Sequence, residues 1–91
     1  MMNVTIEELE KAFRELTKKY HLNFHFAIIK GRRCIEIQGA LENQIYVKTY
    51  EMDEYIAFET LQEKIEEDIE VTRKKRIEAK LSKEKKLSKY N

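Results

Sequence analysis

The fold of this chain is decided by residues 22–38, which read LNFHFAIIKGRRCIEIQ. From Leu22 the larger apolar side chains recur at every second position, as in a β-strand with one buried face. Residues 30–33 supply a turn, after which the alternation resumes with Ile35 and Ile37. The stretch therefore predicts two antiparallel strands joined by a hairpin.

A third strand is predicted over residues 44–50, after a looser connection over residues 39–43. Its two faces differ in composition, with Ile45 and Val47 on one and Tyr46, Lys48 and Tyr50 on the other. One helix is predicted before the three strands in the sequence and another after them. The sequence therefore has the element order α-β-β-β-α.

The helices are indicated by their caps and their apolar spacing. Thr5 and Glu8 have the spacing of a capping box that starts a helix ending near Tyr20. Asp53 is the expected N-cap of the second helix. Each helix has one apolar face, made of Ile6, Leu9, Phe13, Leu16 and Tyr20 in the first and of Phe58, Leu61, Ile65, Ile69 and Thr72 in the second. We expect an α+β fold with a three-stranded antiparallel sheet, both helices on one face, and a long C-terminal helix projecting beyond the core.

The charge of the second helix reverses along its length. Residues 51–70 hold nine acidic residues and one basic residue, whereas residues 71–91 hold nine basic and two acidic ones. The buried stripe ends at Thr72, close to the reversal. We therefore predict a compact domain over residues 1–72 and a basic helical extension, open to fraying, over residues 73–91.

Composition and motifs argue against several classes of protein. The chain has 91 residues, one cysteine and no apolar run long enough for a membrane span, so we expect a cytoplasmic protein with no membrane partner. His21, His25 and Cys34 lack the spacing of a metal site, and no catalytic constellation accompanies them. We predict no enzyme, no cofactor and no bound metal.

Two charged surfaces carry binding hypotheses. The acidic part of the second helix would suit a basic nucleic-acid channel on a partner protein, through Glu59, Glu63, Glu66, Glu67 and Glu70. The basic stretch would neutralise nucleic-acid phosphates or meet an acidic protein surface, through Arg73, Lys74, Lys75, Arg76, Lys80 and Lys83. A solvated helix face is the alternative interpretation of each charge run.

Two further surfaces are hypothesised to bind. The sheet face away from the helices is expected to anchor a protein or stack on a base, unless it is an ordinary solvent-facing surface, and to carry His25, Ile29, Cys34, Tyr46, Lys48 and Tyr50. Ile77 and Leu81 form a predicted homodimer seam. Antiparallel pairing of two C-terminal helices would place the acidic part of one on the basic part of the other and bury these two side chains.

The element order resembles the double-stranded-RNA-binding domain. That family places a lysine-rich segment at the start of its second helix to grip phosphates across a groove. Here the corresponding residues 53–59 are DEYIAFE, which is acidic. The resemblance is one of topology, and RNA-duplex recognition at this position is not expected.

The chain more closely resembles an uncharacterised family of small proteins encoded by phages and prophages of staphylococci and related low-GC Gram-positive bacteria. The likeness covers roughly residues 22–70 and rests on Phe24-His25-Phe26, Ile28-Ile29-Lys30-Gly31, Ile35-Glu36-Ile37-Gln38, a third strand and an acidic helix from Asp53 to about Glu70. The lysine-rich stretch after Val71 is not part of that pattern.

This resemblance implies an early-expressed phage accessory protein that modulates host machinery or phage DNA metabolism. Small phage-encoded inhibitors of bacterial defence, including anti-CRISPR proteins, often have this size and no enzymatic site. We therefore expect a non-enzymatic protein that binds and inhibits a host or defence protein in the cytoplasm of an infected or lysogenic bacterium. The alternative is a nucleic-acid-binding accessory protein that uses the basic C-terminal helix.

Overall fold

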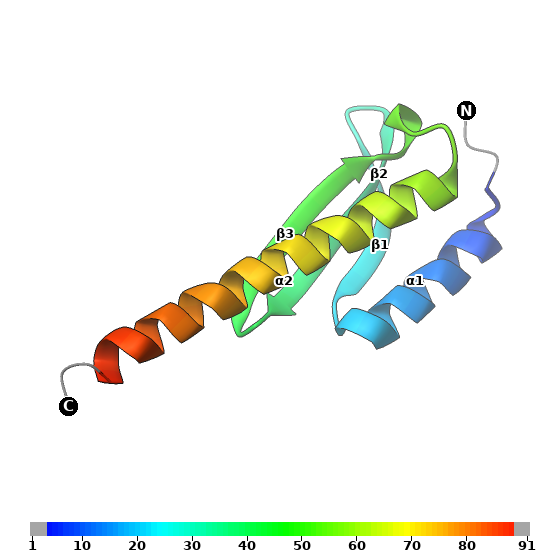
Figure 1. Ribbon diagram of the computed structural model, residues 1–91. Helices are drawn as coiled ribbons and strands as arrows, with labels where there is room; N and C mark the ends of the chain where they lie inside the picture. The colour runs from blue at the N-terminus through cyan, green and yellow to red at the C-terminus, as the bar shows by residue number, and fades with distance from the viewer. Residues whose placement is uncertain (1–3, 89–91) are drawn as a thin grey trace.

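A computed structural model describes residues 4–88, with side chains described as far as Ser82. The chain forms α1 (Ile6–Tyr20), β1 (Asn23–Ile29), β2 (Arg32–Leu41), β3 (Gln44–Glu51), the short 3-10 helix η1 (Met52–Glu54) and α2 (Phe58–Ser88). The strands form one antiparallel sheet in the order β1-β2-β3. Both helices pack against one face of this sheet, and α2 projects far beyond it (Figure 1). The predicted α+β architecture is confirmed.

The first helix begins at the predicted capping box. The backbone N–H of Glu8 donates to Thr5 Oγ1 at 3.2 Å, and the backbone N–H of Thr5 donates to Glu8 Oε2 at the same distance. The buried side chains of α1 are Leu9, Phe13, Leu16 and Tyr20, as the spacing predicts. The prediction that Ile6 belongs to the buried face is wrong, because this residue lies in the first turn of α1, outside the contact with the sheet, and is mostly exposed.

Two tight turns fix the register of the sheet. Lys30 and Gly31 join β1 to β2 with φ values of 52° and 75°, and Glu42 and Asn43 join β2 to β3 with 52° and 64°. Positive φ at both central residues is the type I′ geometry, whose twist suits a two-residue hairpin. The predicted loose connection over residues 39–43 is therefore wrong, since β2 continues to Leu41 and the turn needs only two residues.

This register reverses the predicted faces of β3. Ile35 pairs with Tyr50 and Gly39 with Tyr46, so the tyrosines share the helix-covered face. Tyr46 and Tyr50 are only 5% and 6% exposed, whereas Ile45 is 81% exposed on the outer face. The prediction that Tyr46, Lys48 and Tyr50 lie on the outer face with His25, Ile29 and Cys34 is wrong.

Gly39 is required by the packing of the segment between α1 and β1. A Cβ atom at this position would lie 2.7 Å from Leu22 Cδ2 and 3.3 Å from Leu22 Cα. Leu22 is fully buried, so neither atom has room to retreat. The missing side chain of Gly39 thus lets the chain pass close over the sheet before β1 begins.

The second helix starts later than predicted. Asp53 is not its N-cap, because residues 52–54 form η1 and α2 begins at Phe58; Asp53 instead forms an ion pair with Arg33. Leu61, Ile65 and Ile69 are fully buried, and Phe58 and Thr72 are half-buried on the same face. Burying each of the three apolar side chains contributes about 2 kcal/mol. The predicted stripe is confirmed, and it holds the first half of α2 on the sheet.

Candidate partner-binding surfaces

The outward face of α2 carries an acidic ridge, defined here as Glu59, Glu63, Glu67 and Glu70. All four side chains are exposed, and none forms an ion pair with any side chain that the structure describes. The helix places them over roughly 16 Å of its axis at 1.5 Å per residue. The fifth predicted residue, Glu66, lies nearer the core and pairs with Lys19, Nζ to Oε1 at 3.2 Å.

Asp68, on the same stretch of α2, faces inward and is fully engaged. Its carboxylate accepts a hydrogen bond from Tyr50 Oη at 2.6 Å and pairs with Lys48 and Lys64 at 3.2 Å each. Burial would raise the pKa of Asp68, but the hydrogen bonds from Tyr50, Lys64 and Lys48 lower it overall. Burial, and then the contact with Asp68, raise the pKa of Tyr50. Tyr50 is therefore buried in the fold, and the exposed Lys48 is bound to α2 through Asp68.

Arg73 and Arg76, the two arginines of the predicted basic surface, are both bound to the β2–β3 hairpin. Arg76 Nη1 donates to the carbonyls of Leu41 at 2.9 Å and Gln44 at 3.1 Å, and Nη2 donates to that of Ile45 at 3.0 Å. Its guanidinium also lies 5.8 Å from the ring centre of Tyr46. The contact between α2 and the sheet thus extends past Thr72 to Arg76.

Arg73 makes a single, more exposed contact, because its Nε lies 3.1 Å from Glu42 Oε1 in the turn. The exposed cations left without an ion pair in the described part of α2 are Lys74, Lys75 and Lys80. Lys83 lies in α2, but its side chain falls outside the described residues. The basic surface is therefore smaller than the sequence suggests.

The role of Arg76 was missed because it was grouped with the other cations. The available signal was its position, since residue 76 follows Ile69 and Thr72 at the spacing that keeps side chains on one helix face. An arginine on that face can reach carbonyls at the hairpin end as soon as the apolar stripe stops. Helical spacing, and not charge, was therefore the signal that could have identified the role of Arg76.

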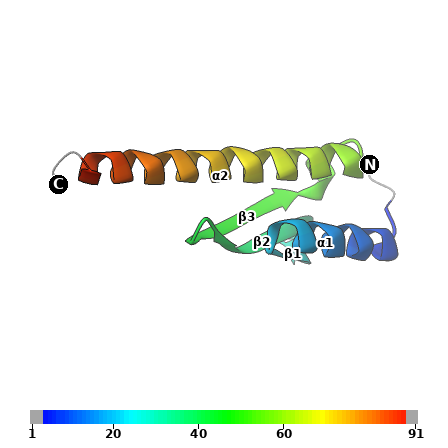
Figure 2. The same ribbon diagram turned by 60° about the horizontal axis from the view of Figure 1, so that its bottom comes forward.

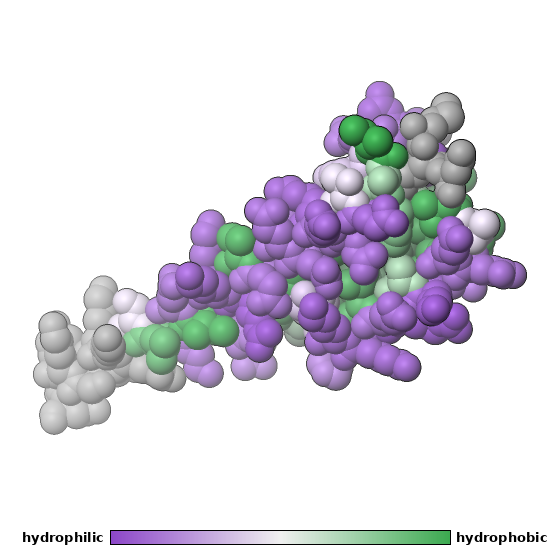
Figure 3. All heavy atoms as spheres, turned by 45° about the vertical axis from the view of Figure 1, so that its right-hand side comes forward, coloured by the Kyte–Doolittle hydropathy of each residue, from purple (hydrophilic) through white to green (hydrophobic). Residues whose placement is uncertain are grey.

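The predicted dimer seam points away from the sheet. Ile77 and Leu81 are exposed, as is Val71, which borders the same surface hollow as Ile77. Figure 3 shows isolated hydrophobic patches on the otherwise hydrophilic projecting part of the molecule. The structure contains one chain, so antiparallel pairing of two α2 helices remains a prediction.

The outer sheet face combines apolar side chains with the Arg32–Glu51 ion pair and a hydrogen bond between His25 and Glu36. Ile45 and Val47 are exposed, Ile29 is partly exposed, and His25 Nε2 lies 2.7 Å from Glu36 Oε2. Cys34 is buried, with its Sγ 3.6 Å from the carbonyl of Arg32. No group of three metal-ligating side chains was found among the described residues.

None of the described helices combines the length and apolar composition needed to cross a bilayer. Comparison of the chain with models of protein families, with curated proteins and with solved structures found no match.

Proposed function

We propose that the protein is a non-enzymatic binding protein whose acidic ridge docks on a basic surface of a partner, a bacterial host or defence protein. The partner surface that fits best is a channel built to hold nucleic acid, because the ridge offers a row of carboxylates where such a channel expects phosphates. Occupying the channel would inhibit the partner. This assignment joins the implication of the phage resemblance to the charge distribution of α2.

The observation that supports the ridge is the contrast between paired and unpaired acids. Glu42, Glu51, Asp53, Glu66 and Asp68 each pair with a lysine or arginine of the fold, and Glu36 contacts His25. The four ridge carboxylates have no such partner within the described residues and stand on a helix fixed by Leu61, Ile65 and Ile69. A rigid, uncompensated row of charge favours association with an opposite surface.

Nucleic-acid binding by the basic stretch is the second candidate. Lys74, Lys75 and Lys80 support it, because they are exposed and uncompensated within the described part of the chain. Arg73 and Arg76 weaken it, since a phosphate contact would compete with their hydrogen bonds to the hairpin. If these three lysines each neutralise one phosphate of duplex DNA, a plot of log K against the logarithm of the salt concentration should have a slope of about −2.7, since each phosphate contributes about −0.9.

Two matched variants separate the candidates. In the first, Glu59, Glu63, Glu67 and Glu70 become Gln; in the second, Lys74, Lys75 and Lys80 become Gln. Immobilised protein is exposed to bacterial lysate treated with nuclease, and retained proteins are quantified at low and high salt. We expect a partner protein that binds less at high salt. The variant with the three lysines replaced should still bind this partner, and the variant with the four ridge glutamates replaced should not.

Recovery of no protein above background, or equal recovery by both variants, would contradict docking by the ridge. Duplex DNA and duplex RNA of about 20 base pairs form the second arm of the experiment. If a duplex binds with the salt-dependent slope given above, and replacing the three lysines abolishes this binding, then nucleic-acid binding is the function and docking by the acidic ridge is not.

A further inference from the structure

The free edge of the sheet at β1 is open to strand addition. All seven residues of β1 pair in continuous register with β2, from Asn23–Gln38 to Ile29–Arg32. No described segment pairs with the edge of β1 that faces away from β2. Proteins usually protect such an edge with proline, lysine, a bulge or a covering segment. Strand β1 reads NFHFAII and has none of the first three.

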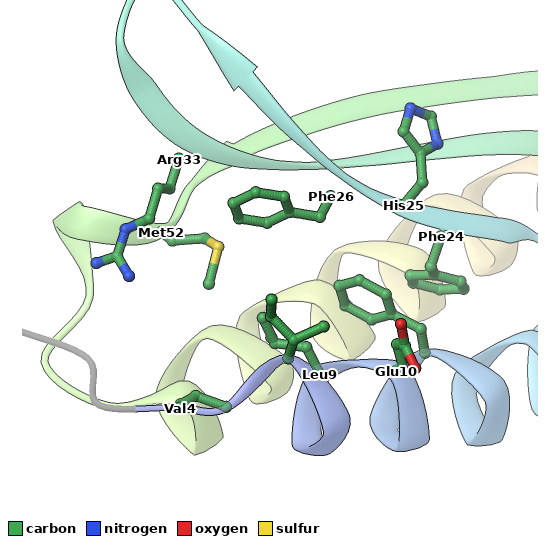
Figure 4. Close-up of a pocket in the computed structure, with 10 residues that line it drawn as sticks. Val4, Leu9, Glu10, Phe24, His25, Phe26, Arg33 and Met52 are labelled. Atoms are coloured by element: carbon green, nitrogen blue, oxygen red, sulfur yellow. The ribbon is translucent and has the colours of Figure 1, made fainter.

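An apolar groove follows this edge on the helix side. It lies between α1 and β1 and has a volume of about 510 Å³. Phe24 of β1 lies beside Glu10 of α1, and the ring of Phe26 points toward Arg33 and Met52 at one end (Figure 4). A second hollow continues the groove toward Thr17 and shares Glu10, Phe13 and Phe24 with the first. We call the two hollows together the β1 groove.

The sheet side of the β1 groove is only partly covered by the fold. Phe24 stacks on Phe13, with ring centres 6.2 Å apart, and is half-buried. Two residues further, Phe26 is 44% exposed, and Ile28 beyond it is 67% exposed. These three side chains lie on one face of β1 at a period of two, which is the spacing that a neighbouring strand would match.

The charges beside the groove indicate which strand would fit. Two cations and one acid, Arg14, Lys18 and Glu10, border the hollow next to Phe24, and none of the three forms an ion pair with a described side chain. An antiparallel β1 of a second copy would bring its own Lys30 to this end of the groove, cation against cation. It would also have to fit a second α1 beside the first, which runs along β1 (Figures 1 and 2). A single extended segment with an acidic end avoids both conflicts.

We propose that the β1 groove binds an extended segment of a partner protein as a fourth strand of the sheet. The segment has apolar side chains at alternate positions, which fill the groove beside Phe24, Phe26 and Ile28. It carries an aspartate or glutamate at the end that meets Arg14 and Lys18. Main-chain hydrogen bonds to Asn23–Ile29 supply affinity, and the alternating pockets supply specificity. This surface is separate from the acidic ridge.

The test begins with random ten-residue peptides displayed on phage and selected on the full-length protein. We expect enriched sequences with apolar residues at every second position and an acid at one end. The best peptide is then synthesised, together with a copy that is N-methylated at the residues whose N–H groups would face β1. Methylation should weaken binding by about 100-fold or more, because it removes the main-chain donors.

Protein variants locate the binding site. Phe26→Asp and Ile28→Asp should each weaken binding by about tenfold or more, whereas Ile45→Asp, at an apolar site on the outer face that is still more exposed, should not change it. Arg14→Gln with Lys18→Gln should weaken binding about threefold to tenfold and remove the preference for an acidic end. Thermal melts identify any variant that fails to fold, and the N-methylated peptide needs no protein variant.

Several results would overturn the proposal. They are the absence of any enriched sequence, enrichment with helical spacing of three and four residues, binding that survives methylation, and equal losses in Phe26→Asp and Ile45→Asp. A dimer seen by sedimentation that Phe26→Asp converts to monomer would show that a second copy occupies the groove, and would also overturn it.

Discussion

The two halves of α2 are continuous in backbone but differ in what holds them. From Phe58 to Arg76 the helix presents an apolar stripe to the sheet, and the stripe ends in a guanidinium bound to three hairpin carbonyls. After Arg76, Ala79 and Lys80 still border a hollow beside the β2–β3 turn, and the last part of α2 extends beyond the sheet (Figure 2). The comparison teaches that the contacts with the sheet continue past the charge reversal at residues 70–71, and that Arg76 belongs to the supported half.

The largest contrast should appear when apolar side chains are truncated in the two halves. Ile65→Ala removes a fully buried side chain and should lower the free energy of unfolding by about 3 kcal/mol. Leu81→Ala removes an exposed one and should change it by less than about 0.5 kcal/mol. Urea unfolding monitored by circular dichroism measures both. Equal losses would show that the projecting half also packs on something.

The boundary itself can be tested at Arg76. Arg76→Ala removes three hydrogen bonds and the contact with Tyr46, so we expect a loss of about 1.5 kcal/mol in unfolding free energy. Arg73→Ala, the matched control, removes one exposed ion pair and should cost about 0.5 kcal/mol. If the control costs as much as Arg76→Ala, the supported half does not end at Arg76.

A smaller effect is expected at Asp68, inside the supported half. Its pKa is lowered in the folded protein, so its contribution is present above the unfolded value of about 3.9 and is lost as the pH falls through the lower folded value. Asp68→Asn should lower the free energy of unfolding by about 1 kcal/mol at pH 7. The loss should disappear at a pH below both the unfolded and the folded pKa of Asp68.

Urea titrations from pH 7 to pH 2 give this difference, with the exposed Glu63→Gln as the control. A gap between wild type and Asp68→Asn that widens toward low pH would contradict the assigned direction of the shift.

The smallest effect concerns association through the projecting half. Ile77 and Leu81 offer little apolar area per chain, so pairing of two α2 helices should be weak, with dimers appearing only toward about 1 mM. Sedimentation equilibrium of wild type and Leu81→Asp over a wide concentration range tests this. A stable dimer at about 10 μM that Leu81→Asp leaves intact would place the interface elsewhere.

Local sequence rules predicted the parts of the fold that depend on neighbouring residues. Thr5 and Glu8 cap α1 as expected, because a capping box needs only four residues. Leu61, Ile65 and Ile69 are buried as expected, because helical spacing determines a face. The turn at Lys30-Gly31 was also predicted from local sequence, since glycine readily takes the positive φ that the turn requires at Gly31.

The errors arose where a distant residue decides. Alternation in β3 does not say which of its faces the helices cover, and pairing with β2 decides it, because Tyr50 lies opposite the buried Ile35 and Tyr46 opposite Gly39. Asp53 fits a cap by composition, yet it pairs with Arg33 from β2. The β1 groove could not be found from sequence, because the exposure of Phe26 depends on how far α1 covers β1.

Hydrogen–deuterium exchange along α2 tests the central contrast most directly. The account predicts that amides from Leu61 to Arg76 exchange only on global unfolding, whereas those after Ile77 exchange through local fraying and are faster by at least about 100-fold. Slow exchange that continues undiminished to Ser88 in the monomeric protein would contradict the division of α2 into a supported and a projecting half.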